Sequence, residues 1–281
     1  MEIKQALITA AGSAQRHLPL QTLVDRDGIP KTALQILIEE VLEAGIESIV
    51  VVIAPGDAPA FTKSAGAFAS RLTFIEQTQP LGYGHAVWSA QEPLSGEPFL
   101  LLVGDHLYLS STSQGCAKQL VTVAKAHKCA VSAVQSTHES KLPLYGAVGG
   151  RLQPGQRGIY EVSEVIEKPS PTEAEQRLVV PGLRTGHYLC FFGMHVLPPA
   201  IMTLLGEEIS AADQGRKVHL THSLARLASR ERYLAAELNG RRYDIGLKYG
   251  ILTAQLALAL SGRDREEVLA GLVDMLARRD A

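Results

Sequence analysis

Short apolar runs alternate with helical patterns over roughly the first 110 residues. The continuous run IVVVI at residues 49–53 is typical of a strand covered on both faces. Four strands are predicted, at residues 6–10, 49–53, 72–76 and 99–103. Helices are predicted between them, at residues 32–44, 59–68 and 85–90. This β-α-β alternation predicts a doubly wound α/β sheet, in which ligands bind beyond the carboxyl ends of the strands.

The pattern changes after this region. The middle of the chain is richer in strands, which are predicted at residues 130–135, 146–149, 159–166 and 188–194, and helices return from residue 197. A last helix at residues 264–279 carries an apolar stripe formed by Val268, Leu269, Leu272, Val273 and Leu276. Such a stripe favours packing within the chain or between subunits over binding to a membrane surface. We expect one domain over residues 1–281, with residues 262–281 as a packing or oligomerisation helix.

Composition narrows the class of protein. Apolar residues make up 46% of the 281 residues and charged residues 20%, which is enough for a sizeable core and argues against disorder. The net charge is -2 and there is no basic stripe, so we expect no nucleic-acid partner. No apolar run approaches ~20 residues and no signal-peptide pattern opens the chain, so we expect no membrane partner. The three unpaired cysteines are interpreted as small buried hydrophobes in a cytoplasmic protein.

The loop at residues 11–16 follows the first predicted strand. Gly12 lets backbone N–H groups approach an anion, and Arg16 adds a fixed charge with forked donors. A surface loop with a solvated arginine fits this short pattern equally well.

The segment 82–86, GYGHA, lies between a predicted strand and a predicted helix. Gly82 and Gly84 permit close approach to a flat ligand such as a base, and the helix N-terminus adds unpaired N–H donors. The amide of Gln77 is able to bind a pyrimidine edge. The alternative is a tight packing turn, and His85 is interpreted as a structural hydrogen-bonding residue.

Four polar residues follow predicted strands or turns. Asp105 comes directly after a buried strand, a common place for a hard cation such as Mg²⁺. Asp244 is either a second carboxylate ligand or the cap of a helix that begins at Ile245. Glu167 and Lys168 can bind sugar hydroxyls and a phosphate, or can form an exposed ion pair at a strand end. Spacing alone does not bring Asp105 and Asp244 together.

In combination and in order, these motifs resemble the bacterial UTP–glucose-1-phosphate uridylyltransferase family of sugar nucleotidyltransferases over residues 6–258. Further resemblance lies at residues 34–46, 144–148, 185–189 and 218–221. The resemblance implies an α/β fold with a Rossmann-like, mixed but mostly parallel sheet flanked by helices. It also implies Mg²⁺-dependent transfer of UMP from UTP to glucose 1-phosphate, and a homo-oligomer is expected.

The resemblance implies a role for each matching residue. Ala11 and Gly12 would line the nucleotide, and Gln77 and Gly82 would bind uracil. Asp105 and Asp244 would hold Mg²⁺. The sugar would lie against Gly146, Glu167 and Gly186, and its phosphate against Lys168.

The chain departs from the family at the phosphate loop and beside the metal carboxylate. The family loop reads roughly A-G-x-G-T-R, whereas Ala14 and Gln15 stand at the second glycine and the threonine, and Arg16 remains. Leu23 stands where a lysine is expected. We therefore expect Lys31, or else Arg26, to supply the missing positive charge, in addition to Arg16 and Lys168.

Further departures are His106 in place of a second acidic residue, and Lys217, His219 and His222 in place of Glu, Gln and Asp. The alternatives are a non-catalytic nucleotide-sugar-binding or regulatory protein, and a transferase for another sugar 1-phosphate.

Overall fold

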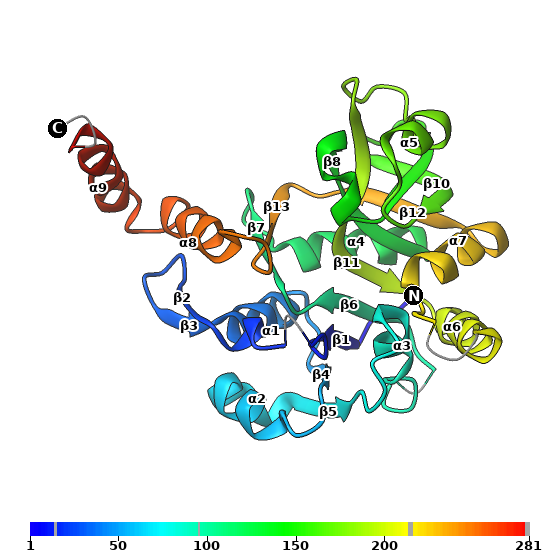
Figure 1. The fold of residues 1–281 in the computed structure, drawn as a ribbon, viewed down its shortest axis with the longest axis horizontal. Coiled ribbons are helices and arrows are strands. Elements are labelled where there is room, and N and C mark those ends of the chain that lie inside the picture. The colour runs from blue at the N-terminus through cyan, green and yellow to red at the C-terminus, as the bar shows by residue number, and fades with distance from the viewer. Residues whose placement is uncertain (14–15, 95, 213–215, 279–281) are drawn as a thin grey trace.

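The fold is a mixed nine-stranded sheet with helices on both faces (Figure 1). The computed structural model describes residues 1–13, 16–94, 96–212 and 216–278. The strands lie in the order β5-β4-β1-β6-β11-β8-β12-β10-β9. This architecture confirms the α/β fold that the alternating pattern predicts.

Parallel strands form one half of the sheet. They are β5 (Leu72–Glu76), β4 (Ser48–Ile53), β1 (Gln5–Thr9) and β6 (Phe99–Val103). Antiparallel pairing begins at β11 (His187–Leu197), which lies between β6 and β8 (Ala130–His138). Beyond these lie β12 (Tyr233–Glu237), parallel to β8, and then β10 (Ile159–Ile166) and β9 (Ala147–Leu152), which are antiparallel to each other.

Alternation along the strands separates two apolar cores. In β1, Ile8 packs in the core that α1 (Ala33–Glu43) and α4 (Cys116–His127) cover. Leu7 points to the opposite face and packs in the core covered by α3 (Tyr83–Trp88), α6 (Ala200–Ala211) and α7 (Leu220–Arg230). A smaller cluster lies between β9, β11, a 3₁₀ turn at Glu139–Leu144 and α5 (Pro171–Arg177).

Two short ladders lie outside the main sheet. β7 (His106–Ser110) pairs with β13 (Gly240–Asp244), and β2 (Thr22–Val24) pairs with β3 (Pro30–Thr32). The β2–β3 hairpin is tied to α8 (Gly250–Leu260) by two hydrogen bonds. The Val24 N–H donates to Gln255 Oε1 at 2.9 Å, and Gln255 Nε2 donates to the Val24 carbonyl at 3.0 Å.

The C-terminal helices extend away from the sheet (Figure 1). α9 (Arg265–Ala277) contacts α8, and none of its residues is buried. Leu276 is 62% exposed and Val273 59% exposed, so the described residues leave most of the predicted apolar stripe uncovered. The predicted helix extends to residue 279, which lies outside the described residues. Within the part of the chain that the structure describes, no helix combines the length and the apolar character needed to cross a membrane.

Some local predictions need correction. α2 (Ala58–Ala65) ends three residues before the predicted boundary, because Gly66 adopts a φ of 56° and a 3₁₀ turn over Gly66–Arg71 follows. The helix α5 lies inside the middle region that the pattern predicts to be rich in strands, between β10 and β11. Cys116 and Cys190 are buried free thiols, as predicted, whereas Cys129 is only partly buried.

Candidate functional site

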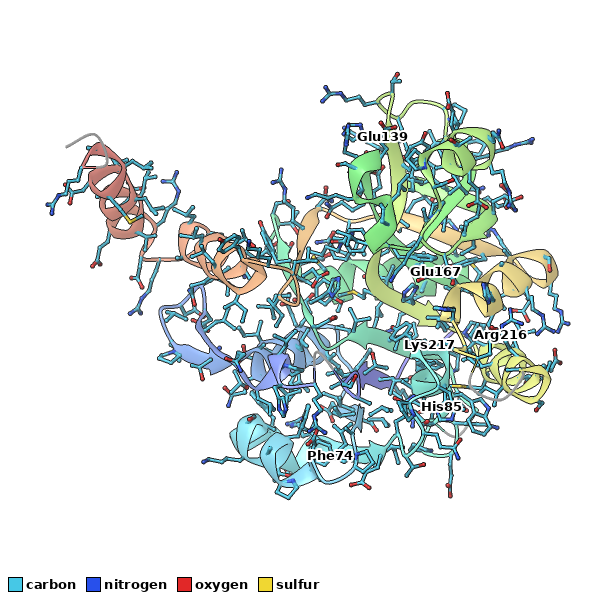
Figure 2. All side chains as sticks on the ribbon, in the orientation of Figure 1. Phe74, His85, Glu139, Glu167, Arg216 and Lys217 are labelled. Atoms are coloured by element: carbon cyan, nitrogen blue, oxygen red, sulfur yellow. The ribbon has the colours of Figure 1, made fainter. Side chains whose placement is uncertain are left out.

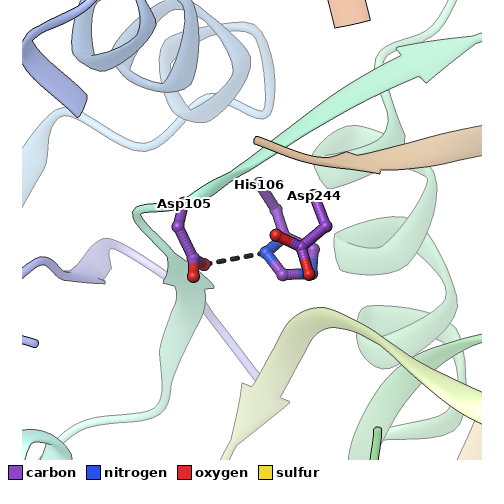
Figure 3. Close-up of side chains that lie close together, drawn as sticks. All are labelled: Asp105, His106 and Asp244. Carbon is purple, nitrogen blue, oxygen red and sulfur yellow. Dashed lines mark hydrogen bonds and ion pairs between the residues drawn. The ribbon is translucent and has the colours of Figure 1, made fainter. Parts of the chain in front are cut away.

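The β7–β13 ladder brings the side chains of Asp105 and Asp244 together. His106 begins β7 directly after Asp105, and the antiparallel register places His106 opposite Asp244. The Ile245 N–H also donates to the Asp105 carbonyl at 2.9 Å. One ligand atom from each of Asp105, His106 and Asp244 lies within 4.8 Å of the others (Figure 3). Tertiary pairing thus supplies the convergence that spacing alone does not predict.

The electrostatics of this cluster suit a divalent cation. His106 Nδ1 lies 2.8 Å from Asp105 Oδ1, and His106 Nε2 lies 3.9 Å from Asp244 Oδ2. Burial raises the pKa of Asp244 and the charge of Asp105 raises it further, against the opposing effect of His106. The side chain of Asp105 is 18% exposed and that of Asp244 is 12% exposed. A bound cation would stabilise both carboxylates in their charged form. The chemistry of this donor set therefore fits a divalent metal ion.

Asp244 does not cap a helix. β13 ends at Asp244, and its Oδ1 accepts a hydrogen bond from the Gly246 N–H at 2.9 Å, which forms a tight turn. The next helix, α8, begins at Gly250 with Tyr249 at its N-cap. The alternative role of Asp244 as a cap for a helix at Ile245 is therefore wrong.

A cavity of about 170 Å³ adjoins this cluster, and His106 belongs to both. Glu167 and Gly146, two of the predicted sugar-binding residues, line it. Glu167 directly follows β10, which packs against α7 (Figure 2). A Cβ atom on Gly146 would lie 2.8 Å from Thr221 Cγ2 and 2.9 Å from Phe191 Cδ2. Only glycine therefore fits at this point of the cavity wall without displacing its neighbours.

Gly186, the third predicted sugar-binding residue, does not line this cavity. It has a φ of 71°, and its carbonyl accepts a hydrogen bond from the Glu139 N–H at 2.9 Å. Figure 2 shows Glu139 at the top of the molecule and Glu167 near the centre. The structure thus brings Gly146 and Glu167 together and leaves Gly186 apart from them.

Lys168 directly follows Glu167 and is exposed. Its backbone has a φ of 46°, a left-handed conformation that is uncommon for a residue with a side chain. No carboxylate in the described part of the chain forms an ion pair with it. Lys168 is therefore an unpaired cation beside the cavity, which suits its predicted contact with a phosphate.

Gln77, Gly82 and His85 form a hydrogen-bonded group at the start of α3. Gln77 Nε2 lies 3.2 Å from the Gly82 carbonyl and 3.0 Å from His85 Nδ1. His85 thus has the structural hydrogen-bonding role predicted for it, and burial lowers its pKa. Because both amide protons of Gln77 have protein acceptors, its Oε1 is left to accept a hydrogen bond from a ligand.

The Gly82–Gly84 turn also packs tightly. Gly82 has a φ of 104°, and a Cβ atom there would lie 2.7 Å from the Val218 carbonyl. The Gly84 N–H donates to that same carbonyl at 2.9 Å. The packing turn considered as an alternative is therefore present, and contact of Gly82 with a base stays a prediction.

The predicted phosphate loop begins beside the turn that leads to Asp105. The Gly104 N–H donates to the Thr9 carbonyl at 2.9 Å, which holds the end of β1 against the turn that leads to Asp105. Ala11 is buried, and the Gly12 carbonyl accepts a hydrogen bond from the Arg16 N–H at 2.8 Å.

Arg16 Nη1 lies 3.6 Å from Asp57 Oδ2, so the guanidinium has one protein partner. Ala14 and Gln15 lie outside the described residues.

Lys31 is held by two carboxylates. Its Nζ lies 2.7 Å from Asp25 Oδ2 and 2.8 Å from Glu39 Oε1. Burial opposes its charge, but the hydrogen bonds to Asp25 and Glu39 outweigh burial and raise the pKa of Lys31. Leu23, at the position where a lysine is expected, is buried opposite Lys31 in the hairpin. Lys31 would therefore have to leave these carboxylates to bind a phosphate.

Several residues of the site have no strong signal in the sequence. Tyr83, His195 and Thr221 also line the cavity, and His219 Nδ1 lies 3.9 Å from Glu167 Oε1. Tyr83 lies within the GYGHA motif and His106 directly follows Asp105, so the sequence carries a signal for both positions. His219 and Thr221 lie in the segment 218–221 that resembles the family, whereas His195 lies in apolar surroundings typical of a core strand.

The chain matches the nucleotidyl transferase family over residues 5–259. The UTP–glucose-1-phosphate uridylyltransferase YngB of Bacillus subtilis (strain 168) is 30% identical over 304 aligned residues, which cover 99% of this chain and 97% of that protein. A second B. subtilis UTP–glucose-1-phosphate uridylyltransferase is 27% identical and covers 99% of both chains. These similarities confirm the resemblance inferred from the motifs.

Solved structures support the same fold. A UDP-glucose pyrophosphorylase complexed with UDP-glucose has a TM-score of 0.72 at 24% identity, over 91% of this chain and 98% of that chain. The UDP-glucose pyrophosphorylase of Acinetobacter baumannii has a TM-score of 0.72 at 23% identity, over 98% of this chain and 100% of that chain. From the extent of the family match and the similarity to YngB, the chain belongs to the nucleotidyl transferase family.

Proposed function

We propose that the protein transfers UMP from UTP to glucose 1-phosphate, giving UDP-glucose and pyrophosphate. The observation that supports this most is the carboxylate pair of Asp105 and Asp244 beside a cavity that Glu167 lines. The names and full-length coverage of the B. subtilis relatives support the same substrates.

The reaction would be an in-line displacement. A phosphate oxygen of glucose 1-phosphate forms a bond to the α-phosphorus of UTP, the bond to the β-phosphate oxygen breaks, and pyrophosphate leaves. Ala11, Gly12, Gln77 and Gly82 would position the nucleotide, and Gly146 and Glu167 the sugar. No covalent nucleophile on the protein is required, because positioning and charge neutralisation supply the catalysis.

Asp105 and Asp244, with His106 as a third donor, would hold a divalent cation, which we propose to be Mg²⁺. When bound, this ion neutralises charge on the phosphates of the substrate. Arg16, Lys31 and Lys168 would supply the remaining positive charge. Of these three, Lys168 is unpaired within the described ranges, Arg16 has one weak partner, and Lys31 has to exchange its carboxylates for a phosphate.

We also propose that residues 262–281 mediate a homo-oligomer within a single-domain chain. The support is the exposed apolar set on α9, namely Leu269, Val273, Met275 and Leu276. An apolar helix face that the rest of its own chain leaves uncovered is typical of an interface between subunits. Val273→Glu should lower the molecular mass measured by sedimentation, and Gly271→Ala, on the same helix, should leave it unchanged.

The proposed reaction is tested by incubating the pure protein with UTP, glucose 1-phosphate and Mg²⁺ and measuring pyrophosphate release. Asp244→Asn should reduce turnover by roughly 100-fold or more, since it removes a charge that acts on the reacting phosphates. Asp27→Asn, a change on the exposed hairpin, is the control.

If no pyrophosphate is released with any nucleotide or sugar 1-phosphate, while UDP-glucose still binds, the protein is a non-catalytic nucleotide-sugar-binding protein. Release with another sugar 1-phosphate alone would instead correct the substrate.

A further inference from the structure

Three buried polar side chains form a hydrogen-bonded chain inside the sheet. Ser132 Oγ on β8 lies 2.5 Å from His195 Nδ1 on β11 and 2.5 Å from Tyr233 Oη on β12. All three residues are at most 3% exposed. Buried polar groups in an apolar core are costly unless each one is satisfied, so the direction of each hydrogen bond is constrained.

Counting protons assigns these directions. Ser132 Oγ is the only acceptor among the described residues within reach of the Tyr233 hydroxyl, so Tyr233 donates to Ser132. The single Ser132 proton is then left to donate to His195, whose Nδ1 accepts it. Burial lowers the pKa of His195 to about 3, so its ring is neutral and its one proton is on Nε2.

The Nε2 atom of His195 is the ring nitrogen that takes no part in the hydrogen-bonded chain. His195 lines the cavity next to Phe191, and its ring packs edge-on against that of Phe191 with 5.0 Å between centroids. The fully buried side-chain N and O atoms without a partner, within the described ranges, are Gln5 Oε1, Asp57 Oδ2, Tyr83 Oη, Thr221 Oγ1 and Arg242 Nη1. Nε2 of His195 has no hydrogen bond to any described residue and is not one of these buried atoms, so it retains access to the cavity that His195 lines.

A bulge in β11 makes this arrangement possible. The pairing of β11 with β8 shifts register between Phe191 and His195, and Gly193 adopts a φ of 84° there. A Cβ atom on Gly193 would lie 2.7 Å from Val103 Cγ2 and 3.4 Å from His106 Cδ2. The bulge thus places His195 in the wall of the cavity that adjoins the candidate metal ligands Asp105, His106 and Asp244.

We propose that His195 is a specificity-determining residue whose Nε2–H donates a hydrogen bond to a hydroxyl oxygen of the sugar in this cavity. Ser132 and Tyr233 are positioning residues that set its tautomer. The cavity offers a further group to a polyhydroxylated ligand, because the carboxylate of Glu167 in its lining is an acceptor. The cavity volume of about 170 Å³ is several times the ~30 Å³ that one water molecule occupies, so the cavity holds more than a single water. This inference rests on the proposed function for the identity of the ligand as a sugar.

The tautomer is measured without any substrate. Protein labelled with ¹⁵N-histidine should show, for His195, an unprotonated Nδ1 and a protonated Nε2 by NMR, and loss of this signal in His195→Phe assigns it. Ser132→Ala should shift the signal, since Nδ1 loses its hydrogen-bond donor. A protonated Nδ1 in the wild type would overturn the proposal.

The sugar contact is measured by calorimetry with glucose 1-phosphate and a set of deoxy analogues, each of which lacks one hydroxyl. One analogue should bind the wild type roughly 10-fold more weakly than glucose 1-phosphate, the size of one lost hydrogen bond. His195→Phe should abolish that discrimination, and His195→Gln should keep it because its amide still donates. His127→Gln, at the end of α4 and outside the cavity lining, is the control.

Two outcomes separate failure of this proposal from failure of the proposed function. If the wild type binds glucose 1-phosphate and His195→Phe keeps the same discrimination among the analogues, the role of His195 is wrong while the proposed function stands. If the wild type binds no sugar phosphate and no UDP-glucose, both are wrong.

Discussion

Asp244 lies directly opposite His106 in the β7–β13 ladder, so a histidine stands between the two carboxylates of the candidate cation site. The resemblance to the family expects an acidic residue at position 106. An imidazole nitrogen is a better ligand for later transition metals than for Mg²⁺, which prefers oxygen. The ladder thus predicts an altered metal preference.

His106→Asp should restore an all-oxygen donor set. We expect the ratio of Co²⁺ affinity to Mg²⁺ affinity to fall by roughly 10-fold in this variant, because the nitrogen ligand is lost and a negative charge is gained. Calorimetric titration of the purified protein with each metal gives the ratio, and the visible absorption of bound Co²⁺ reports nitrogen ligation. An unchanged ratio, with His127→Asp as the reference, would show that His106 is not a ligand.

Lys31→Ala should reduce turnover by roughly 100-fold if Lys31 neutralises phosphate charge in the transition state. UTP binding should be mostly intact, because the proposed nucleotide contacts lie in other segments. Steady-state kinetics and calorimetry with UTP separate the two effects. Asp25→Asn removes one carboxylate partner but keeps the ammonium, so it should retain activity. If Lys31→Ala turns over like the wild type, Lys31 has only a structural role, in which it stabilises the hairpin through Asp25 and Glu39.

Gly146→Ala should narrow the cavity, because the added Cβ would lie 2.8 Å from Thr221 Cγ2. We expect the KM for glucose 1-phosphate to rise by roughly 10-fold, the typical cost of one misplaced methyl group in a pocket. The KM for UTP should change little. Overpacking should also lower the free energy of unfolding by about 1–3 kcal/mol. Gly271→Ala is the control, since its Cβ position has no neighbour within 4 Å among the described residues. Equal changes in both KM values would argue against a sugar pocket at Gly146.

Acid should destabilise the protein in part through His195. Burial lowers the pKa of this residue to about 3 in the folded protein, below the usual value of 6.5 that the unfolded chain retains. The stability that depends on neutral His195 is therefore complete above pH 6.5 and is lost as the pH falls towards 3. Between pH 7.5 and pH 5 the wild type should lose about 2 kcal/mol more than His195→Phe. Urea unfolding at both pH values measures this difference, and His127→Gln should behave like the wild type. Parallel losses in wild type and His195→Phe would mean that His195 does not stay neutral.

The parallel half of the fold was predictable because its strands are continuous apolar runs. Residues 72–76 and 99–103 are predicted with the bounds that β5 and β6 have. β7 and β13 were not predicted, since five-residue strands in a two-stranded ladder carry little periodic signal. The convergence of Asp105 on Asp244 depends on that ladder, and only the resemblance to a family anticipated it.

The hydrogen-bonded chain from Tyr233 to His195 was also beyond the sequence analysis. Its three members lie far apart in the chain, with Ser132 63 residues from His195 and 101 residues from Tyr233. A histidine in an apolar strand is also usually a satisfied core residue. The partners of Lys31 were missed for the same reason, because the charge of a lysine says nothing about which carboxylates the fold places beside it.

The paired hydrogen bonds between Val24 and Gln255 have a mechanical consequence. The strand β13 ends at Asp244, and α8 begins a few residues later at Gly250. Through Gln255, α8 is hydrogen-bonded to the hairpin that carries Lys31. A neighbouring molecule that displaced α8 would therefore move Asp244, a proposed metal ligand, and Lys31, a proposed phosphate-binding cation, in the same event.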